Sequence, residues 1–204
     1  MSPAPARTST DAIVAAARSL LEDGGSDAVT MQAVAAEVGV RAPSLYKRVV
    51  DRSALLRAVG DAVAADLQAA ILGAIHGGDP ADDLRSVADA YRRFVRGNPH
   101  GYSLLFQPST AASAPDPTAL ANIGRPIVEI MLRMPGGGWT TGSPEHEADR
   151  ALEAARTIVA WAHGFVDLEL AGGFRLGGDL DRAYRTGVDT IIAGLSGPAT
   201  RTAG

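Results

Sequence analysis

Cysteine is absent from the 204-residue sequence, which excludes disulfide bonds, thiolate metal sites and thiol-based redox sensing. Aromatic residues make up only 5% of the chain, and no segment shows the alternation of apolar and polar residues that is typical of a β-strand. There is no run of about eighteen apolar residues, which argues against a transmembrane helix. The polar first residues, MSPAPARTST, do not form a secretory signal. These absences predict an all-α cytoplasmic protein with no membrane partner.

The sequence patterns of common enzymes and metal sites are also missing. There is no nucleophile elbow, Walker loop or dinucleotide-binding fingerprint. The four histidines lie far apart, without the spacing of three or four residues that a metal site on a helix needs. Glu145, His146 and Asp149 form one local cluster, which the charged start of a helix explains equally well. We therefore expect no enzyme activity, no metal and no cofactor.

The stretch TMQAVAAEVGVRAPSLYKRVV has the outline of a helix-turn-helix. Val34 and Val38 mark the apolar side of a first short helix, and Leu45 and Val49 mark that of a second. Gly39 lies between them, where a tight turn needs a residue that adopts the left-handed conformation. The second helix is predicted over Ala42 to Val49, and this is the helix that would enter a major groove.

This stretch is basic, although the protein carries a formal net charge of −4. Between residues 41 and 52 there are four cations and one anion. The cations are Lys47, which is the only lysine in the chain, and Arg41, Arg48 and Arg52; the anion is Asp51. A cluster of cations can be no more than a solvated surface. Together with the glycine turn and the two apolar stripes, it favours contact with DNA, confined to this patch.

The remaining pattern predicts a small helical domain followed by a larger one. A first helix is expected from near Thr8–Thr10 to Gly24–Gly25, and Thr30 is placed to cap the next. A fourth helix, starting around Asp51 to Ser53, connects to a second domain, so we predict a DNA-binding domain over residues 1–51 and an effector-binding and dimerisation domain over 52–204. Further helices are predicted over residues 82–96, 118–134 (bent or interrupted at Pro126), 145–170 and 179–195.

The last two helices are apolar on more than one side, so each needs more than one partner. They could be ordinary core helices, but we favour packing against the same pair in a second copy, as an isologous four-helix bundle. The candidate interface residues are Leu152, Ala155, Val159, Ala162, Val166, Tyr184, Val188, Ile191 and Leu195.

The region from Thr30 to Leu56 resembles the DNA-binding domain of TetR-type bacterial transcriptional regulators. The resemblance rests on Thr30, on Gly39-Val40 in the turn, on Leu45-Tyr46 and on Arg52 at the start of the connecting helix. Val49 replaces the usual aromatic residue, and Arg52 replaces the usual lysine. The resemblance implies that Thr30, Tyr46 and Arg52 contact DNA. With the neighbouring candidates, the predicted DNA-binding residues are Thr30, Gln32, Arg41, Ala42, Ser44, Leu45, Tyr46, Lys47, Arg48 and Arg52.

A weaker resemblance covers WAHGFVDLEL, from Trp161 to Leu170, which is similar to the Trp-His-Gly motif of one TetR C-terminal subtype, with Ala162 inserted. The family resemblance implies homodimerisation and a small-molecule pocket in each subunit. His163, in an apolar helix, either finds an internal partner or faces a polar ligand group. Arg92, Arg93 and Arg96 are expected to form a solvated face, and the alternative is that one of them reaches an anionic ligand. The candidate pocket residues are Tyr91, Phe94, Tyr102, Phe106, Met131, Trp161, His163 and Phe165.

These observations predict a ligand-responsive, homodimeric repressor that binds a palindromic double-stranded DNA operator. The effector is an unidentified small molecule. The alternative is a DNA-binding regulator or architectural protein that has no small-molecule effector.

Overall fold

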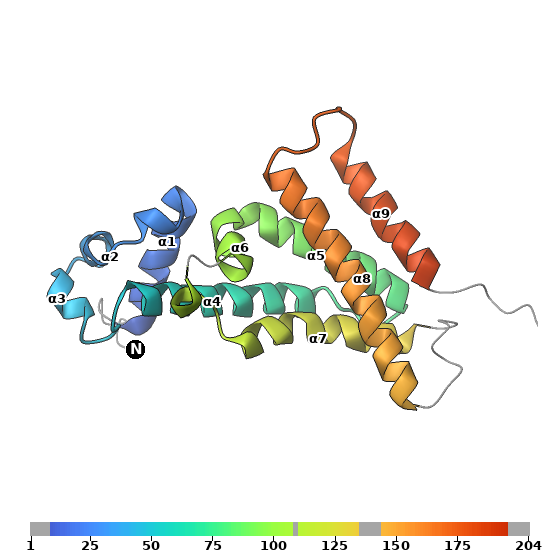
Figure 1. Cartoon of the computed structure of the whole chain (residues 1–204), viewed down its shortest axis with the longest axis horizontal. Helices are drawn as coiled ribbons and strands as arrows, with labels where there is room; N and C mark the ends of the chain where they lie inside the picture. The colour runs from blue at the N-terminus through green and yellow to red at the C-terminus, as the bar shows by residue number, and fades with distance from the viewer. Residues whose placement is uncertain (1–8, 108–109, 135–143, 196–204) are drawn as a thin grey trace, which may run out of the picture. The chain divides into compact units, whose positions relative to one another are not determined.

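The computed structural model describes residues 9–107, 110–134 and 144–195. Within these ranges every regular element is a helix, which confirms the all-α class (Figure 1). No helix among the described residues is long and apolar enough to cross a membrane. The elements are α1 (Thr10–Ala28), α2 (Met31–Glu37), α3 (Ala42–Leu45), α4 (Arg52–Gly73), α5 (Pro80–Gly97), α6 (Pro99–Phe106), the short 3-10 helix η1 (Ala111–Ser113), α7 (Pro117–Arg133), α8 (Pro144–Leu170) and α9 (Leu180–Leu195).

The chain divides into two compact units. The first contains residues 1–67 together with 97–120, and the second contains residues 68–96 and those from 121 onward. The division lies inside α4, so the domain boundary predicted between residues 51 and 52 falls within the first unit, at the turn before α4.

Capping side chains begin the helices of the first unit. The Ser9 hydroxyl accepts a hydrogen bond from the Ala12 amide at the start of α1, and the Thr30 hydroxyl accepts one from the Ala33 amide at the start of α2, as predicted. Thr8 lies outside the described residues. Gly25, at φ 71°, breaks the helical path of α1 near the predicted end, although one further turn follows. The core of this unit is aliphatic and includes Ile13, Leu21, Val34, Leu45, Leu55, Leu56, Val59 and Leu67.

Helix α6 is attached to α1 within the first unit. The residue before this helix, Asn98, does not cap it with its side chain. Instead, the Glu22 carboxylate on α1 accepts hydrogen bonds from the amides of His100 (3.2 Å) and Gly101 (2.8 Å). Free N–H groups at a helix start favour an anionic partner, so Glu22 satisfies two of them. The side chain of Arg18 adds a 3.0 Å hydrogen bond to the Asn98 side chain.

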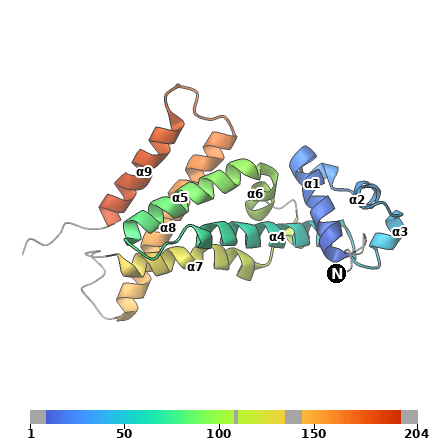
Figure 2. The same cartoon turned by 180° about the vertical axis from the view of Figure 1, so that it is seen from behind.

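The second unit contains α5, α7, α8 and α9, and α8 and α9 run as antiparallel neighbours in both views (Figures 1 and 2). Helix α7 continues through Pro126, so the interruption predicted there does not occur. Aromatic rings fill the space between α8 and α9: Tyr184 stacks on Trp161 at 5.4 Å between ring centroids and meets Phe165 edge-on at 5.1 Å. The Tyr184 hydroxyl donates to the Ala88 carbonyl at 2.9 Å, and burial raises the pKa of this phenol.

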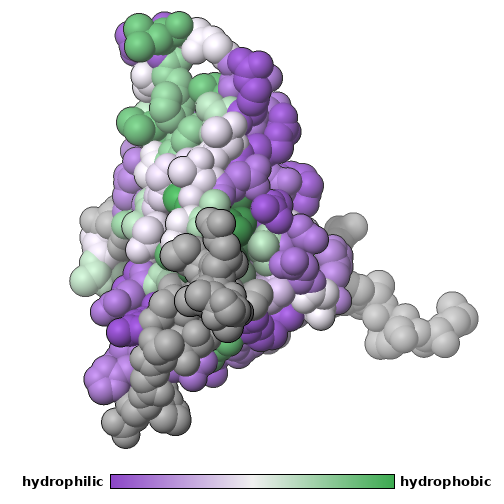
Figure 3. All heavy atoms as spheres, turned by 90° about the vertical axis from the view of Figure 1, so that its right-hand side faces the viewer, coloured by the Kyte–Doolittle hydropathy of each residue, from purple (hydrophilic) through white to green (hydrophobic). Residues whose placement is uncertain are grey.

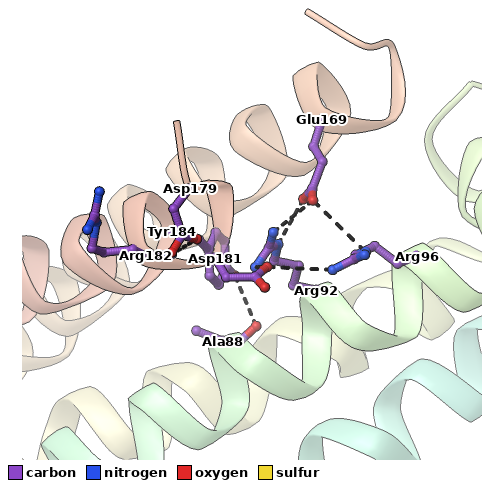
Figure 4. A network of polar contacts seen from close by, with 8 residues as sticks. All are labelled: Ala88, Arg92, Arg96, Glu169, Asp179, Asp181, Arg182 and Tyr184. Carbon is purple, nitrogen blue, oxygen red and sulfur yellow. Dashed lines mark hydrogen bonds and ion pairs between the residues drawn. The ribbon is translucent and has the colours of Figure 1, made fainter. Parts of the chain in front are cut away.

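Arg92 on α5 belongs to this core and not to a solvated face, which corrects the expectation for that residue. It is 8% exposed and forms a bidentate pair with the Glu169 carboxylate on α8, at 2.8 and 2.7 Å, and an ion pair with Asp181 on α9 at 2.8 Å (Figure 4). Its guanidinium also lies 4.9 Å from the centre of the Tyr184 ring. Buried cations require partners of this kind. The sequence contains one indication that Arg92 is buried: it follows Ala88 by four residues and so lies on the apolar side of the helix.

Candidate DNA-binding surface

The turn between α2 and α3 has the geometry that the sequence predicts. Gly39 has φ 72°, which favours glycine, and the Val40 amide donates to the Ala35 carbonyl at 2.9 Å. Val34 and Ala35 on α2 are buried, as is Leu45 on α3, and the two helices lie against each other. Their other sides remain available to a partner.

Helix α3 is shorter than the predicted Ala42–Val49. It ends at Leu45, and a turn follows in which the amides of Arg48 and Val49 both donate to the Leu45 carbonyl, at 2.8 and 2.9 Å. Pro43 is compatible with the first turn of α3. Asp51 caps the next helix, α4, by accepting a 2.8 Å hydrogen bond from the Ala54 amide. The predicted DNA-facing residues therefore lie partly on a helix and partly on the turn after it.

The exposed residues of this segment form the candidate contact surface. Arg41, Lys47 and Arg48 are exposed and make no ion pair with any described residue. Tyr46 is 55% exposed, so its ring and hydroxyl are accessible to a partner. Thr30 and Gln32 are also exposed, while Ala42 and Ser44 are half-buried. The surface thus combines cations, hydroxyls, an amide and an aromatic ring, the groups that contact phosphates and base edges.

Leu45 is the exception among the predicted contacts. Its side chain is 0% exposed, in the core of the first unit. A side chain that fills the core cannot reach a base edge without unfolding the motif, so its contribution to DNA binding is to hold α3 in place. The sequence allowed both readings, because Leu45 was also one of the residues that defined the apolar stripe.

Arg52 is half-buried and bonded to backbone. Its Nε donates to the Val29 carbonyl at 2.7 Å, and its Nη2 donates to the Ser26 carbonyl. These carbonyls belong to the last turn of α1 and the residue after it. The resemblance placed Arg52 at a DNA phosphate, and nothing in the sequence indicated these carbonyl partners.

The predicted pocket residues do not all belong to one unit. Tyr102 and Phe106 lie in the first, where their rings are 5.1 Å apart, and the other six lie in the second. Met131 is fully buried. His163 does have a nearby internal group, since its Nδ1 lies 3.5 Å from the Tyr91 hydroxyl. Glu145 is outside the described side chains, and among those described no three metal-binding groups gather.

The predicted interface residues on α8 and α9 separate into two groups. Leu152 and Val159 are exposed, at 37% and 41%, and Ile191 and Leu195 are half-buried. The other five are in the subunit's own core and are unavailable to a second copy in this conformation: Ala155, Ala162, Val166, Tyr184 and Val188. Figure 3 shows neutral and apolar residues along the side of the molecule where α8 and α9 lie, with a hydrophobic patch at its upper end. Phe174 and Leu176, in the connection between the two helices, are exposed as well.

Comparison with known proteins gives the family of the chain. Residues 13–59 match the model described as "Bacterial regulatory proteins, tetR family", and residues 84–191 match "Tetracyclin repressor-like, C-terminal domain". An uncharacterised HTH-type transcriptional regulator of Mycobacterium tuberculosis is 30% identical over 170 residues, which is 82% of this chain and 73% of that protein. The chain belongs to the TetR family. This TetR-family protein is therefore a DNA-binding regulator, and the matched residues 13–59 contain α2, the turn and α3.

Solved structures agree with the fold of this TetR-family protein. A Rhodococcus sp. RHA1 protein of unknown function is 25% identical, with a TM-score of 0.71 over 92% of this chain and 95% of that chain. A TetR variant from Acinetobacter baumannii AYE, in complex with minocycline, is 21% identical, with a TM-score of 0.63 over 91% and 95%. At that identity the second match concerns the fold alone.

Proposed function

We propose that this TetR-family protein is a ligand-responsive, homodimeric repressor that binds a palindromic operator. The observation that carries the DNA contact is the group of exposed cations Arg41, Lys47 and Arg48 in an otherwise acidic chain. Such a group attracts the phosphate backbone locally while the rest of the protein repels it. Thr30, Tyr46, Lys47 and Arg48 would position the backbone, and Arg41 and Ser44 would read bases.

A second copy is proposed on the exposed side of α8 and α9. Leu152 and Val159 expose large apolar side chains there, and Ile191 and Leu195 remain half-exposed. An isologous contact would bury the same residues in both copies and would place two reading surfaces on one duplex. The half-sites would then lie about one helical turn apart.

Ligand response is proposed for the second unit. The A. baumannii relative has the same fold and binds minocycline in its crystal structure. In this chain the Tyr91 hydroxyl and His163 are polar groups next to an aromatic cluster, the mixture that a small-molecule site requires. A ligand that binds better to the arrangement unsuited to DNA, with a coupling of roughly 1–3 kcal/mol, would lower operator affinity about 5- to 150-fold.

The DNA contact is tested with Lys47. A duplex enriched from a random-sequence pool by the full-length protein serves as probe. Lys47→Ala is expected to weaken binding to this duplex and to a scrambled duplex alike, and to reduce the slope of log affinity against log salt by about 0.9, the value for one lost phosphate contact. Lys47→Arg keeps the charge and should keep the slope. No enriched sequence, or an unchanged slope in Lys47→Ala, would contradict the proposal.

The competing reading is a DNA-binding regulator without an effector. A thermal-shift screen of small molecules against the full-length protein separates the two. A compound that raises the melting temperature and also releases the enriched duplex supports a ligand-responsive regulator. Compounds that stabilise the protein but leave DNA binding unchanged favour a regulator without an effector.

A further inference from the structure

We propose that Arg52 is a positioning residue that holds the DNA-reading segment at both of its ends, and that it does not serve as a phosphate contact. The inference rests on the proposed function, because it assigns a role within that DNA-binding surface. It also departs from what the family resemblance implied for this position.

The geometry of Arg52 carries the inference. It is the first residue of α4, and its guanidinium donates to the carbonyls of Val29 and Ser26, 23 and 26 residues earlier in the chain. The segment between these partners, residues 30–51, contains α2, the turn and α3. Arg52 therefore ties the end of that segment to its beginning. One side chain thus joins the residues on either side of the helix-turn-helix segment.

Each end of this tie is itself well anchored. The Val29 side chain is 0% exposed, and its amide donates to the Ser26 carbonyl, which Arg52 also uses. Thr30 follows directly and caps α2. On the other side, Asp51 caps α4. Movement of the end of α1 relative to the start of α4 would break both guanidinium bonds, so these bonds fix the two ends of the segment 30–51 relative to each other.

The chemistry of the tie requires arginine. Nε and Nη2 belong to one rigid planar group and can donate to two carbonyls at once. A lysine ammonium carries the same charge, but it is a single point on a flexible stem and does not reproduce the paired geometry. A phosphate contact does not require arginine, because a lysine ammonium can bind a phosphate as well as a guanidinium can. Asp27, 3.9 Å away and fully exposed, adds little to the tie.

Substitution by lysine therefore separates the two roles. The probes are the duplex enriched by the wild-type protein and a scrambled duplex of equal length. Arg52→Lys is expected to lower affinity for the enriched duplex about tenfold, the order that loss of a charge-assisted hydrogen bond produces, and to leave affinity for the scrambled duplex and the salt slope unchanged. Arg52→Ala should lose a similar factor on the enriched duplex. The ratio of the two affinities, and not overall affinity, is the measured quantity.

Arg57→Lys is the matched control. Arg57 also lies on α4 and donates through Nε and Nη2 to a backbone carbonyl, that of Ala112, which is outside the reading segment. Its replacement removes a comparable contact and should leave the affinity ratio unchanged. A ratio that falls equally in Arg57→Lys would mean a general loss of structure and would overturn the proposal. So would an Arg52→Lys variant that binds like the wild type.

A measurement without DNA keeps this proposal separate from the proposed function. Hydrogen exchange at the Val29 and Ala33 amides, which bond to Ser26 and Thr30, should become faster in Arg52→Lys and not in Arg57→Lys. If the wild-type protein enriches no DNA, the proposed function fails and exchange still decides whether the tie exists. Unchanged exchange in Arg52→Lys would overturn the tie itself.

Discussion

Gly187 shows how closely α8 and α9 approach each other. A Cβ atom built at this position would lie 2.1 Å from Cζ2 of Trp161, a separation that real atoms do not adopt. The Trp161 ring is also stacked on Tyr184, so it has little room to move aside. In the sequence Gly187 was recognisable only as a small residue that permits close packing.

Gly187→Ala should therefore destabilise the protein although alanine is the better helix former. Overpacking of this kind costs about 1–3 kcal/mol, more than the gain in helix propensity of roughly 1 kcal/mol. Urea denaturation of both proteins measures the difference in the free energy of unfolding. Gly194→Ala, where an added Cβ meets nothing within 4 Å, is the control and should be neutral or stabilising. Equal effects of the two substitutions would contradict the packing argument.

Asp83 is a carboxylate buried to 2% exposure near the start of α5. One oxygen accepts from Arg133 at 2.6 Å and the other from the His76 amide at 2.8 Å. The hydrogen bond from Arg133, with that from His76, lowers the pKa of Asp83 below its ordinary value despite the opposing effect of burial. A lowered folded-state pKa means that the charged form stabilises the fold above the unfolded pKa and that this stabilisation is lost as the pH falls through the folded value.

Asp83→Asn is expected to lower stability at pH 7 by roughly 1–3 kcal/mol, because an amide cannot accept from both donors. The deficit should shrink as the pH falls below about 4, because the unfolded wild-type chain then takes up a proton at Asp83 before the folded chain does, which removes the stabilisation by the ionised form. Denaturation midpoints of the wild type and of Asp83→Asn, measured from pH 7 to pH 3, give this difference in stability. Asp82→Asn, at a neighbouring side chain that is 74% exposed, should have a much smaller effect. A deficit that stays constant with pH would contradict the assignment to ionisation.

At the scale of elements, helices were predictable because their signals are local. The caps at Thr30 and near Asp51 and the glycine turn at Gly39 occur where the sequence indicated. The misplaced end of α3 has a different origin, since the Val49 side chain faces the core (7% exposed) although the helix has already ended. Apolar spacing reports burial, and a turn can bury a side chain as well as a helix can.

Arg92 joins α5 to both α8 and α9 through ion pairs. Without Arg92, the one ion-pair partner left to Glu169 (13% exposed) among the described residues is Arg96, at 3.9 Å. We expect Arg92→Ala to cost about 3–5 kcal/mol, the range for breaking a buried ion pair, and to speed hydrogen exchange in α9. Calorimetric melting and exchange measure the two effects. Arg93→Ala, at the exposed neighbour, should change stability by no more than about 0.5 kcal/mol. A much smaller loss of stability in Arg92→Ala would show that this ion pair contributes little to the fold.

At the scale of the whole molecule, the chain is a two-unit DNA-binding regulator of the TetR family whose proposed active form contains two copies. The proposed interface carries exposed apolar residues, and these are what a second copy would cover. Leu152 and Val159 lie seven residues apart, on the same side of α8. Their burial would link the pairing of subunits to the spacing of two reading surfaces on DNA.

Val159→Glu is therefore expected to leave the subunit folded and to separate the dimer, because two like charges would face each other across an isologous contact. Sedimentation velocity would report a monomer, and affinity for the enriched duplex would fall with it. Thr157→Glu adds the same charge to an exposed position about 160° around the helix and should preserve the dimer. If the Val159→Glu variant is still a dimer, the interface lies elsewhere. If the wild-type protein is a monomer, the proposed homodimer is wrong.

The sequence by itself determined the helical class, the reading motif with its basic patch, and the approximate bounds of most helices, because periodicity, caps and glycine turns act between residues a few positions apart. Tertiary structure alone decided what Arg52, Arg92 and Leu45 contact. Their partners are brought together by packing of segments distant in the chain: Arg52 meets Val29, and Arg92 meets Glu169 and Asp181. A cation looks the same in a sequence whether it faces phosphate, a carbonyl or a buried carboxylate, and only the fold supplies the neighbour.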